Sequence, residues 1–503
     1  MLRCDGGQPC GTCAFGRREV PCEYPDGTIT TSSPLGLDRR LALPDICSSD
    51  SSEELSVSTA SSAEFSMPVE FFTPDVELPD LQPFGPFSFP ADTLLPHSVL
   101  PSNTMPPHPH FQVDSPIQDP QNEAEELSNV RKLFLTHRFQ LGLGVPDSTL
   151  VAISQGTSDH SVLHPALLHA SQLMGTALLK NNVSNEREAE QIHLTLGALQ
   201  DPGPRVPRGP VASLQAVTLL SLYFFHKGNI ARARALVLTG NTLAREHNLD
   251  IMSSLSEPAT PVEPGRVGFL MSPTIQAETR AVVAQLVYLD ASYAIILKLP
   301  SLVDPLLRTN FKKLIARPAE EEINLVRAKS AFLLYEAQQL AVEWYQQSSL
   351  ADTEVAGWQR NYWDVMEWLN THRSFLALAL TKIVFCPKLH TMGLSLKVST
   401  IVVLTGISVL LSLFSPDHPE LLQRNHAAIT EIVSISSAFN EEDYEHLEPI
   451  LSVCWTAILG KLEEWMILGP DPGVKIHDIP TMAMIIRQKI ETLQRILPCA
   501  VNS

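Results

Sequence analysis

Helical periodicity from residue 122 to the end of the chain is the feature that most constrains the fold. Apolar residues recur at helical spacing in successive segments, and Gly- and Pro-rich breaks such as DPGP at 201–204 and GPDPG at 469–473 separate most of them. No stretch alternates between apolar and polar residues with a period of two over a sustained length. The sequence therefore predicts a mostly α protein whose residues 122–503 form an all-α domain of helices stacked on helices.

Twelve segments are expected to be helical. The first begins in the acidic run at 123–126, which suits the first turn of a helix. One later segment, 398–414, is almost entirely apolar, but it is at the lower length limit for a membrane span and is diluted by Ser and Thr, so we expect a buried central helix and no membrane partner. The predicted helices are 122–139, 165–181, 186–199, 211–225, 230–247, 275–298, 324–347, 358–385, 396–414, 419–439, 447–468 and 481–497.

Residues 26–121 are expected to be a long disordered linker. The stretch from Leu41 to Val130 contains no Lys or Arg and is rich in Ser, Pro, Asp and Glu. Within it, EFFTPDVELPD at 70–80 and the nearby Phe84, Phe87 and Phe89 mix acidic and aromatic side chains. Such mixtures are typical of activation segments that dock onto coactivator proteins. A plain acidic linker is the alternative.

Four cysteines in residues 1–25 form the pattern C-x5-C-x2-C-x8-C. Thiolates bind Zn²⁺ tetrahedrally, and a C-x2-C pair lets two sulfurs reach one metal from a tight turn. The segment has too few apolar residues for a core, so bound Zn²⁺ would supply its folding free energy. A disulfide-linked knot and an unstructured tail are the alternatives. The cysteines are Cys4, Cys10, Cys13 and Cys22.

The net charge of −19 limits what the bulk of the chain can bind. A strongly acidic surface does not attract nucleic acid nonspecifically. A DNA-binding protein with this balance must concentrate its positive charge in a small module, which suits the cysteine segment.

The cysteine segment resembles the second half of the fungal zinc-cluster (Zn2Cys6) DNA-binding domain. RCDG at 3–6 is similar to the family's third-cysteine segment, PCGTC at 9–13 to its fourth and fifth cysteines, and CEY at 22–24 to its sixth. The family's first two cysteines and the basic run that follows them have no counterpart here. The chain either continues upstream of Met1 or has lost a working cluster; the intact second half favours the first explanation.

This resemblance implies a nuclear transcription regulator that binds double-stranded DNA at CGG-like sites, and it is compatible with a homodimer. The zinc ligands would be Cys4, Cys10, Cys13 and Cys22, and the contacts to DNA phosphates would come from Arg3, Arg17 and Arg18. Four thiolates cannot reproduce the family's site of six thiolates and two zinc ions. We therefore expect weak or no specific DNA binding from the chain as it stands.

A second resemblance covers roughly residues 130–310. HPALLHA at 164–170, LQAVTLL at 214–220 and YFF at 223–225 are similar to motifs of the fungal-specific transcription factor domain that follows zinc clusters. Further on, Glu278, Arg280, LD at 289–290 and KLP at 298–300 follow its pattern loosely, with Arg280 one place early and Lys298-Leu299 in place of Gly-Arg. The resemblance implies an all-α regulatory domain.

Asp290, near Tyr293 and Arg280, is expected to make a buried polar contact. A hydrogen bond that locks the helix is the simpler interpretation, and a ligand site is the alternative.

The sequence does not indicate an enzyme. It contains no P-loop, no G-x-G-x-x-G after a strand, no G-x-S-x-G, no H-E-x-x-H and no paired Asp-rich motifs of the kind that all-α prenyl-type catalysts carry. The closer rival is a relative of the zinc-cluster family that acts through protein contacts and does not touch DNA. That rival would tolerate the loss of Cys10, whereas a DNA-binding regulator would not.

Overall fold

The chain divides into two compact units, Met1–Gln82 and Pro83–Ser503. A computed structural model describes residues 22–23, 29–30, 120–157, 163–179, 185–200, 208–249, 272–316, 322–346, 352–386, 392–414, 418–468 and 478–497. In the first unit, β1 (Cys22–Glu23) pairs antiparallel with β2 (Ile29–Thr30), so that Cys22 lies opposite Thr30.

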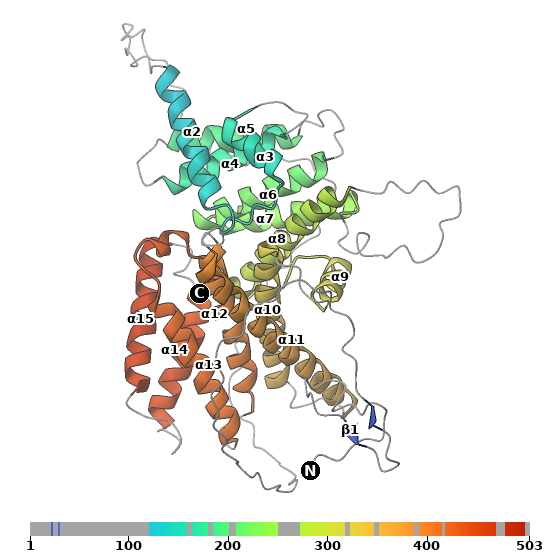
Figure 1. Ribbon diagram of the computed structural model, residues 1–503, viewed down its shortest axis with the longest axis vertical. Helices are drawn as coiled ribbons and strands as arrows, with labels where there is room; N and C mark the ends of the chain where they lie inside the picture. The colour runs from blue at the N-terminus through green and yellow to red at the C-terminus, as the bar shows by residue number, and fades with distance from the viewer. Residues whose placement is uncertain are drawn as a thin grey trace, which may run out of the picture. The chain divides into compact units, whose positions relative to one another are not determined.

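The second unit consists mostly of helices and contains no strand among its described residues (Figure 1). Its fourteen α-helices among those residues confirm the predicted mostly α fold. They are α2 (Pro120–Thr136), α3 (Asp147–Gln155), α4 (Pro165–Leu178), α5 (Asn185–Gln200), α6 (Gly209–His226), α7 (Ile230–Glu246), α8 (Pro273–Leu297), α9 (Pro305–Ile315), α10 (Ile323–Gln346), α11 (Asp352–Phe385), α12 (Gly393–Leu411), α13 (Pro419–Ser437), α14 (Ile450–Leu468) and α15 (Ile479–Ile496), with a short 3-10 helix, η4 (Asp443–His446), before α14.

Each of the twelve predicted segments contains a helix, and α3 and α9 were missed. Both are short, with nine and eleven residues, so each offers few repeats of the apolar pattern. Their starting signals were nevertheless present. Asp147 supplies acid to the first turn of α3, and the Asp304 side chain caps α9 by accepting a hydrogen bond from the Leu306 amide at 2.8 Å.

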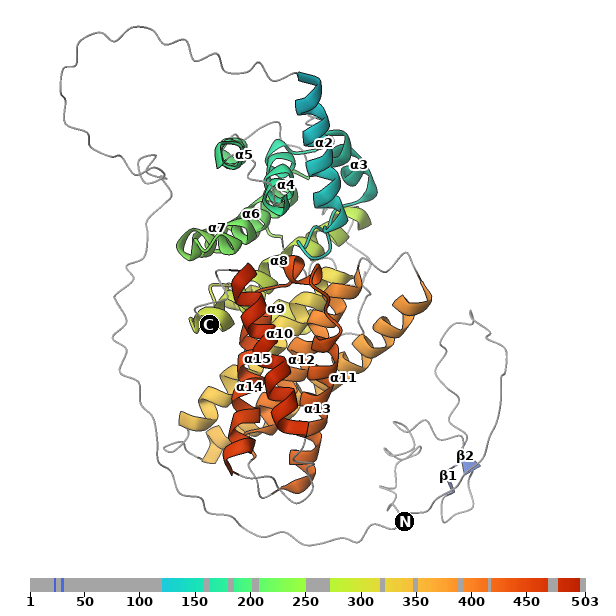
Figure 2. The ribbon, with the colours of Figure 1, turned by 90° about the vertical axis from the view of Figure 1, so that its left-hand side faces the viewer.

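Helix α10 lies at the centre of the packing in the second unit. It packs on α8 and on α12, while α6 and α7 pack on α8, and α4 packs on α2, α5 and α6. Helix α12 also packs on α13 and α14, α14 contacts α8, and α15 packs on α13 and α14. Figures 1 and 2 both show α12 to α15 below α4, α5 and α6. The buried apolar side chains form one contiguous core that includes Phe134, Phe225, Phe311 and Trp455.

Two helices, α8 and α12, are long and apolar enough to cross a membrane. The most apolar stretches of α8 and α12 are 89% and 83% buried by neighbouring helices. This burial is what we expected for the apolar segment at 398–414, which forms most of α12. Apolar side chains on every face are typical of a core helix that other helices surround.

Candidate functional site

The predicted zinc site lies almost wholly outside the described residues. Only Cys22 is placed, as the first residue of β1, and the other predicted ligands lie outside the described residues. The donor set itself suits zinc, because four thiols within nineteen residues match a tetrahedral thiolate site. Within the described residues, no group of three or more His, Cys, Asp or Glu side chains could hold a metal ion. The residues predicted at this site but not described are Cys4, Cys10, Cys13, Arg3, Arg17 and Arg18.

The most unusual polar arrangement in the described residues is a buried ion pair between α10 and the segment before α14. The Arg327 side chain is 1% exposed, and its Nε lies 2.9 Å from Oε1 of Glu448, which is also buried. Tyr288 of α8 donates its hydroxyl hydrogen bond to the other Glu448 oxygen, and the Arg327 guanidinium lies over the Tyr288 ring at 4.3 Å from its centroid. Three distant segments thus meet at one carboxylate.

Burial and charge pairing control ionisation in this cluster. Burial, and after it the neighbouring Glu448 carboxylate, raises the pKa of Tyr288 well above its ordinary value, so the phenol stays protonated and remains a donor. Burial alone would lower the pKa of Arg327, but the Glu448 and Tyr288 contacts outweigh it and the pKa is raised. The cluster therefore holds one fixed positive and one fixed negative charge, which stabilise each other in a low-dielectric interior.

A glycine loop after α2 is held beside this ion pair. The Gly142 carbonyl accepts hydrogen bonds from Gln215 Nε2 at 3.2 Å and from Asn324 Nδ2 at 3.1 Å. Gly142 has φ +75°, and a Cβ atom there would lie 2.0 Å from Oε1 of Gln285. The loop backbone can approach Gln285 this closely only because residue 142 has no side chain.

Three buried polar atoms at the cluster have no hydrogen-bond partner among the described residues: Gln285 Nε2, Asn324 Oδ1 and Arg327 Nη2. The neighbouring atoms of the same side chains are engaged, since Arg327 Nη1 donates to Gln285 Oε1 at 3.1 Å. The cluster combines a paired charge with a protonated phenol and no activated nucleophile. Its contacts hold α8, α10, the entry to α14 and the glycine loop together, and sequence reasoning missed all of them.

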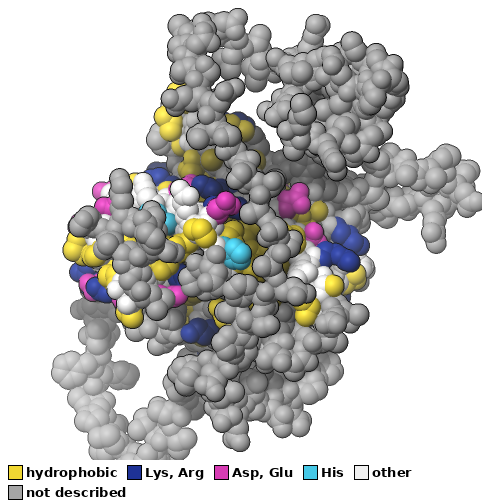
Figure 3. Space-filling model, turned by 90° about the horizontal axis from the view of Figure 1, so that it is seen from below, with side chains coloured by type: hydrophobic (Ala, Val, Ile, Leu, Met, Phe, Trp, Pro, Cys, Tyr) yellow, Lys and Arg dark blue, Asp and Glu magenta, His cyan; other side chains and the backbone are white. Residues whose placement is uncertain are grey.

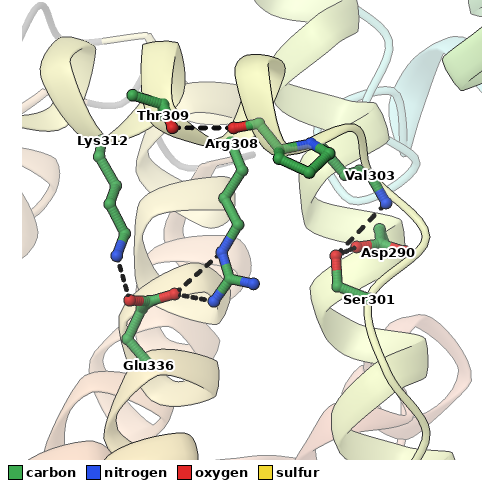
Figure 4. A network of polar contacts seen from close by, with 8 residues as sticks. Asp290, Ser301, Val303, Arg308, Thr309, Lys312 and Glu336 are labelled. Carbon is green, nitrogen blue, oxygen red and sulfur yellow. Dashed lines mark hydrogen bonds and ion pairs between the residues drawn. The ribbon is translucent and has the colours of Figure 1, made fainter.

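Asp290 makes a buried polar contact, as predicted. Its carboxylate holds the segment between α8 and α9 by hydrogen bonds (Figure 4). One Asp290 oxygen accepts from the Leu302 amide at 2.7 Å and the other from the Ser301 hydroxyl at 2.5 Å. Burial raises the pKa of Asp290, and these hydrogen bonds oppose that rise. The Tyr293 hydroxyl lies 3.2 Å from Ser221 Oγ on α6. These contacts favour the hydrogen-bond interpretation over a ligand site.

The predicted helix start at His164 also acquires a physical role. His164 precedes α4, and its Nδ1 accepts a hydrogen bond from the Ala166 amide at 3.2 Å, while Pro165 occupies the first helical position. His164 thus caps the N-terminus of α4, and Pro165 fixes the φ angle of its first residue.

Comparison of the chain with known protein families, with curated proteins and with solved structures found no match. The two family resemblances therefore rest on the sequence motifs at 3–24 and 164–300, and they stay predictions.

Proposed function

We propose that this protein is a transcription regulator of the fungal zinc-cluster type, with an N-terminal zinc-held DNA-binding module and an all-α regulatory domain. The observation that carries the proposal is the combination of PC-x2-C at 9–13 with RCDG before it and CEY after it. A helical body of some 380 residues after a long acidic linker supports the same domain order.

In this proposal, Cys4, Cys10, Cys13 and Cys22 hold zinc, which supplies folding free energy to a segment without a core. The nearby cations Arg3, Arg17 and Arg18 contact DNA phosphates, and such contacts make binding steeply dependent on salt. Coactivator proteins bind the acidic aromatic segment at 70–89, and the protein acts in the nucleus. The helical domain carries regulation and no catalysis.

The zinc content of the purified chain tests the proposal. We expect about one zinc per chain, because four thiolates complete one tetrahedral site. The variant Cys10→Ser/Cys13→Ser should lose the metal, whereas Cys386→Ser, at a free cysteine at the end of α11, should keep it. A metal-free wild-type chain, or equal loss in both variants, would refute the proposal.

DNA binding separates the proposal from its rival. We expect the chain as it stands to bind a CGG-containing duplex weakly or not at all at physiological salt, since the basic run of the family has no counterpart here. Adding any in-frame upstream codons that encode C-x2-C and a basic run should restore tight binding. Nanomolar binding by the 503-residue chain alone would contradict this expectation.

The second candidate function is a regulator that acts only through protein contacts. The net charge of −19 favours it, because a strongly acidic chain does not attract nucleic acid. In cells, this candidate predicts that Cys10→Ser leaves regulation intact, whereas the leading proposal predicts its loss.

A further inference from the structure

A surface along α7, α9 and the segment between α8 and α9 combines exposed cations with exposed leucines. Arg234 of α7 donates to the Pro300 carbonyl at 3.3 Å, and Asn241, two turns further on, donates to the Leu302 carbonyl at 3.2 Å. These contacts place one face of α7 against residues 300–302, just before α9. We call this surface the α7–α9 face, and its members are Arg234, Leu238, Lys298, Leu299, Leu306 and Lys313.

The carboxylates beneath the α7–α9 face are already engaged. Asp290 is held by Ser301 and Leu302, and Glu336 of α10 pairs with both Arg308 and Lys312 of α9 (Figure 4). The single negative charge of Glu336 therefore faces two positive charges, those of Arg308 and Lys312. Both acids are buried, and the half-buried Asp304 at the start of α9 accepts a hydrogen bond from the Leu306 amide, so the exposed charged side chains of this face are the cations Lys298 and Lys313.

Two lysines on the α7–α9 face have no carboxylate partner among the described residues. Lys298 ends α8, Lys313 lies in the last turn of α9, and both side chains are exposed. Figure 3 shows Lys and Arg side chains at the right of the view beside hydrophobic and acidic side chains. In a chain of net charge −19, such a cationic patch attracts acidic groups and few others.

The backbone at Lys298 is a second unusual feature of this face. Lys298 has φ +53°, the left-handed conformation that helix ends usually assign to Gly or Asn. A side chain with a Cβ atom is disfavoured in that conformation. The position holds a cation that projects into solvent, although a glycine would suit the backbone better.

Exposed leucines add an apolar component between these cations. Leu306 is 68% exposed at the start of α9, and Leu238 and Leu299 are more than one-third exposed. A phosphate backbone would neutralise the cations but leave these three side chains uncovered. A peptide with both carboxylates and apolar side chains would engage both kinds of group.

We propose that the α7–α9 face binds an acidic peptide segment that carries leucine or aromatic side chains. Carboxylates of the partner pair with the exposed Lys298 and Lys313, and its apolar side chains cover Leu238, Leu299 and Leu306. This interaction goes beyond the proposed function and does not depend on zinc or on DNA binding.

Fluorescence anisotropy with the purified full chain tests the proposal. The probe is a labelled synthetic peptide with the sequence of residues 70–89, which has four acidic residues and five phenylalanines. We expect a Kd of about 10 μM at about 50 mM salt, weakening as salt rises because exposed charges are screened. The same peptide with its acids replaced by Asn and Gln should bind at least about tenfold more weakly.

Charge reversal locates the binding surface. Lys298→Glu/Lys313→Glu should weaken binding about tenfold or more, since two attractive contacts become repulsive. Lys132→Glu/Arg360→Glu is the matched control, because it reverses two exposed cations on α2 and α11 and changes the net charge equally. Absence of binding by the wild type, or equal weakening by both variants, would overturn the proposal. So would a duplex DNA that competes as well as the peptide at equal charge.

A glycine variant separates binding from stability. Lys298→Gly removes the cation and relieves the left-handed backbone, so we expect about threefold weaker binding with the melting temperature unchanged within about 2 °C. Leu306→Ser should also weaken binding while leaving stability nearly unchanged, because its side chain is mostly exposed. If Lys298→Gly binds as well as the wild type, the lysine is not part of the binding surface.

Discussion

Two glutamates of this protein each bind an arginine beside an aromatic ring, yet their surroundings differ. Glu448 and Arg327 meet in the core beneath Tyr288, with side chains 9% and 1% exposed. Glu336 pairs with Arg308 and Lys312 near the surface, where the Arg308 side chain is 30% exposed and lies close to Tyr335. The two glutamates are about equally buried, and only the exposure of their cations to water distinguishes the two pairs.

Burial changes what each contact does for stability. An ion in the interior loses several kcal/mol of hydration, so the buried pair tolerates no missing partner. A pair near the surface gains little from its charge because water and salt screen it, and it contributes about 0–1 kcal/mol. The buried pair therefore makes the fold sensitive to single substitutions, whereas the Glu336 contacts adjust the local charge of the α7–α9 face.

The largest expected effect comes from breaking the buried pair. Glu448→Gln keeps the size of the side chain but leaves Arg327 as an uncompensated buried cation, so the free energy of unfolding should fall by about 3–5 kcal/mol. Urea denaturation followed by circular dichroism measures this loss. The double variant Arg327→Met/Glu448→Gln should be less destabilised than Glu448→Gln alone, and a loss below about 1 kcal/mol in the single variant would contradict the assigned pairing.

The next largest effect is a pH dependence that comes from buried His372. Burial, and after it the positive charge of Lys329, lowers the pKa of His372 to about 3 in the folded protein, from 6.5 for an exposed histidine. Below pH 6.5 the unfolded chain binds a proton that the folded protein does not, so the free energy of unfolding falls as pH falls from 6.5 towards 3.

Between pH 6.5 and 5 this loss should reach about 1.6 kcal/mol, and its slope approaches about 1.4 kcal/mol per pH unit towards pH 5. Stability curves for the wild type and His372→Gln measure it, since the variant should lose this part of the pH dependence. His247→Gln, at an exposed histidine beyond the end of α7, is the control and should behave like the wild type. Parallel curves for the wild type and His372→Gln would show that His372 titrates normally.

A smaller effect is expected at the surface pair. Glu336→Gln removes the carboxylate from Arg308 and Lys312 and should lower the free energy of unfolding by about 1 kcal/mol, less at high salt. It should also tighten binding of the acidic peptide, because Arg308 and Lys312 are released from Glu336. If Glu336→Gln lowers the free energy of unfolding as much as Glu448→Gln does, the exposure of the cations does not explain the difference between the two pairs.

The smallest effect is expected at Lys298. In Lys298→Gly, relief of the left-handed backbone and loss of a favourable cation at the end of α8 nearly cancel, so stability should change by less than about 0.5 kcal/mol. Thermal denaturation measures this change. A fall of more than about 1 kcal/mol in the free energy of unfolding would mean that the Lys298 side chain stabilises the fold, which its exposed position does not predict.

The positions of most helices were predictable because a helix is specified by residues three and four places apart. The predicted segment 211–225 corresponds to α6 and the segment 419–439 to α13, each within about two residues at either end. The start of α11 at Asp352 was placed six residues late, because Asp352 to Gly357 hold few apolar residues that would mark the core-facing side.

The buried cluster was not predictable by the same reasoning. Arg327 reads as one more charged residue in a helical segment, and Glu448 as one of several acids near 441–448. Their pairing joins residues 121 positions apart, and the bond from Asn324 to the Gly142 carbonyl joins residues 182 positions apart. Local patterns carry no information about which distant side chains will meet.

Three features follow from local periodicity, composition and spacing. They are the helices among the described residues from 120 onward, the acidic stretch without Lys or Arg before them, and the spacing of four cysteines near the N-terminus, which suits a zinc site. Tertiary packing alone sets which charges are buried and paired and which remain in solvent on the α7–α9 face. Burial depends on how helices distant in the chain pack together, and it sets the energetic consequence of every polar contact described above.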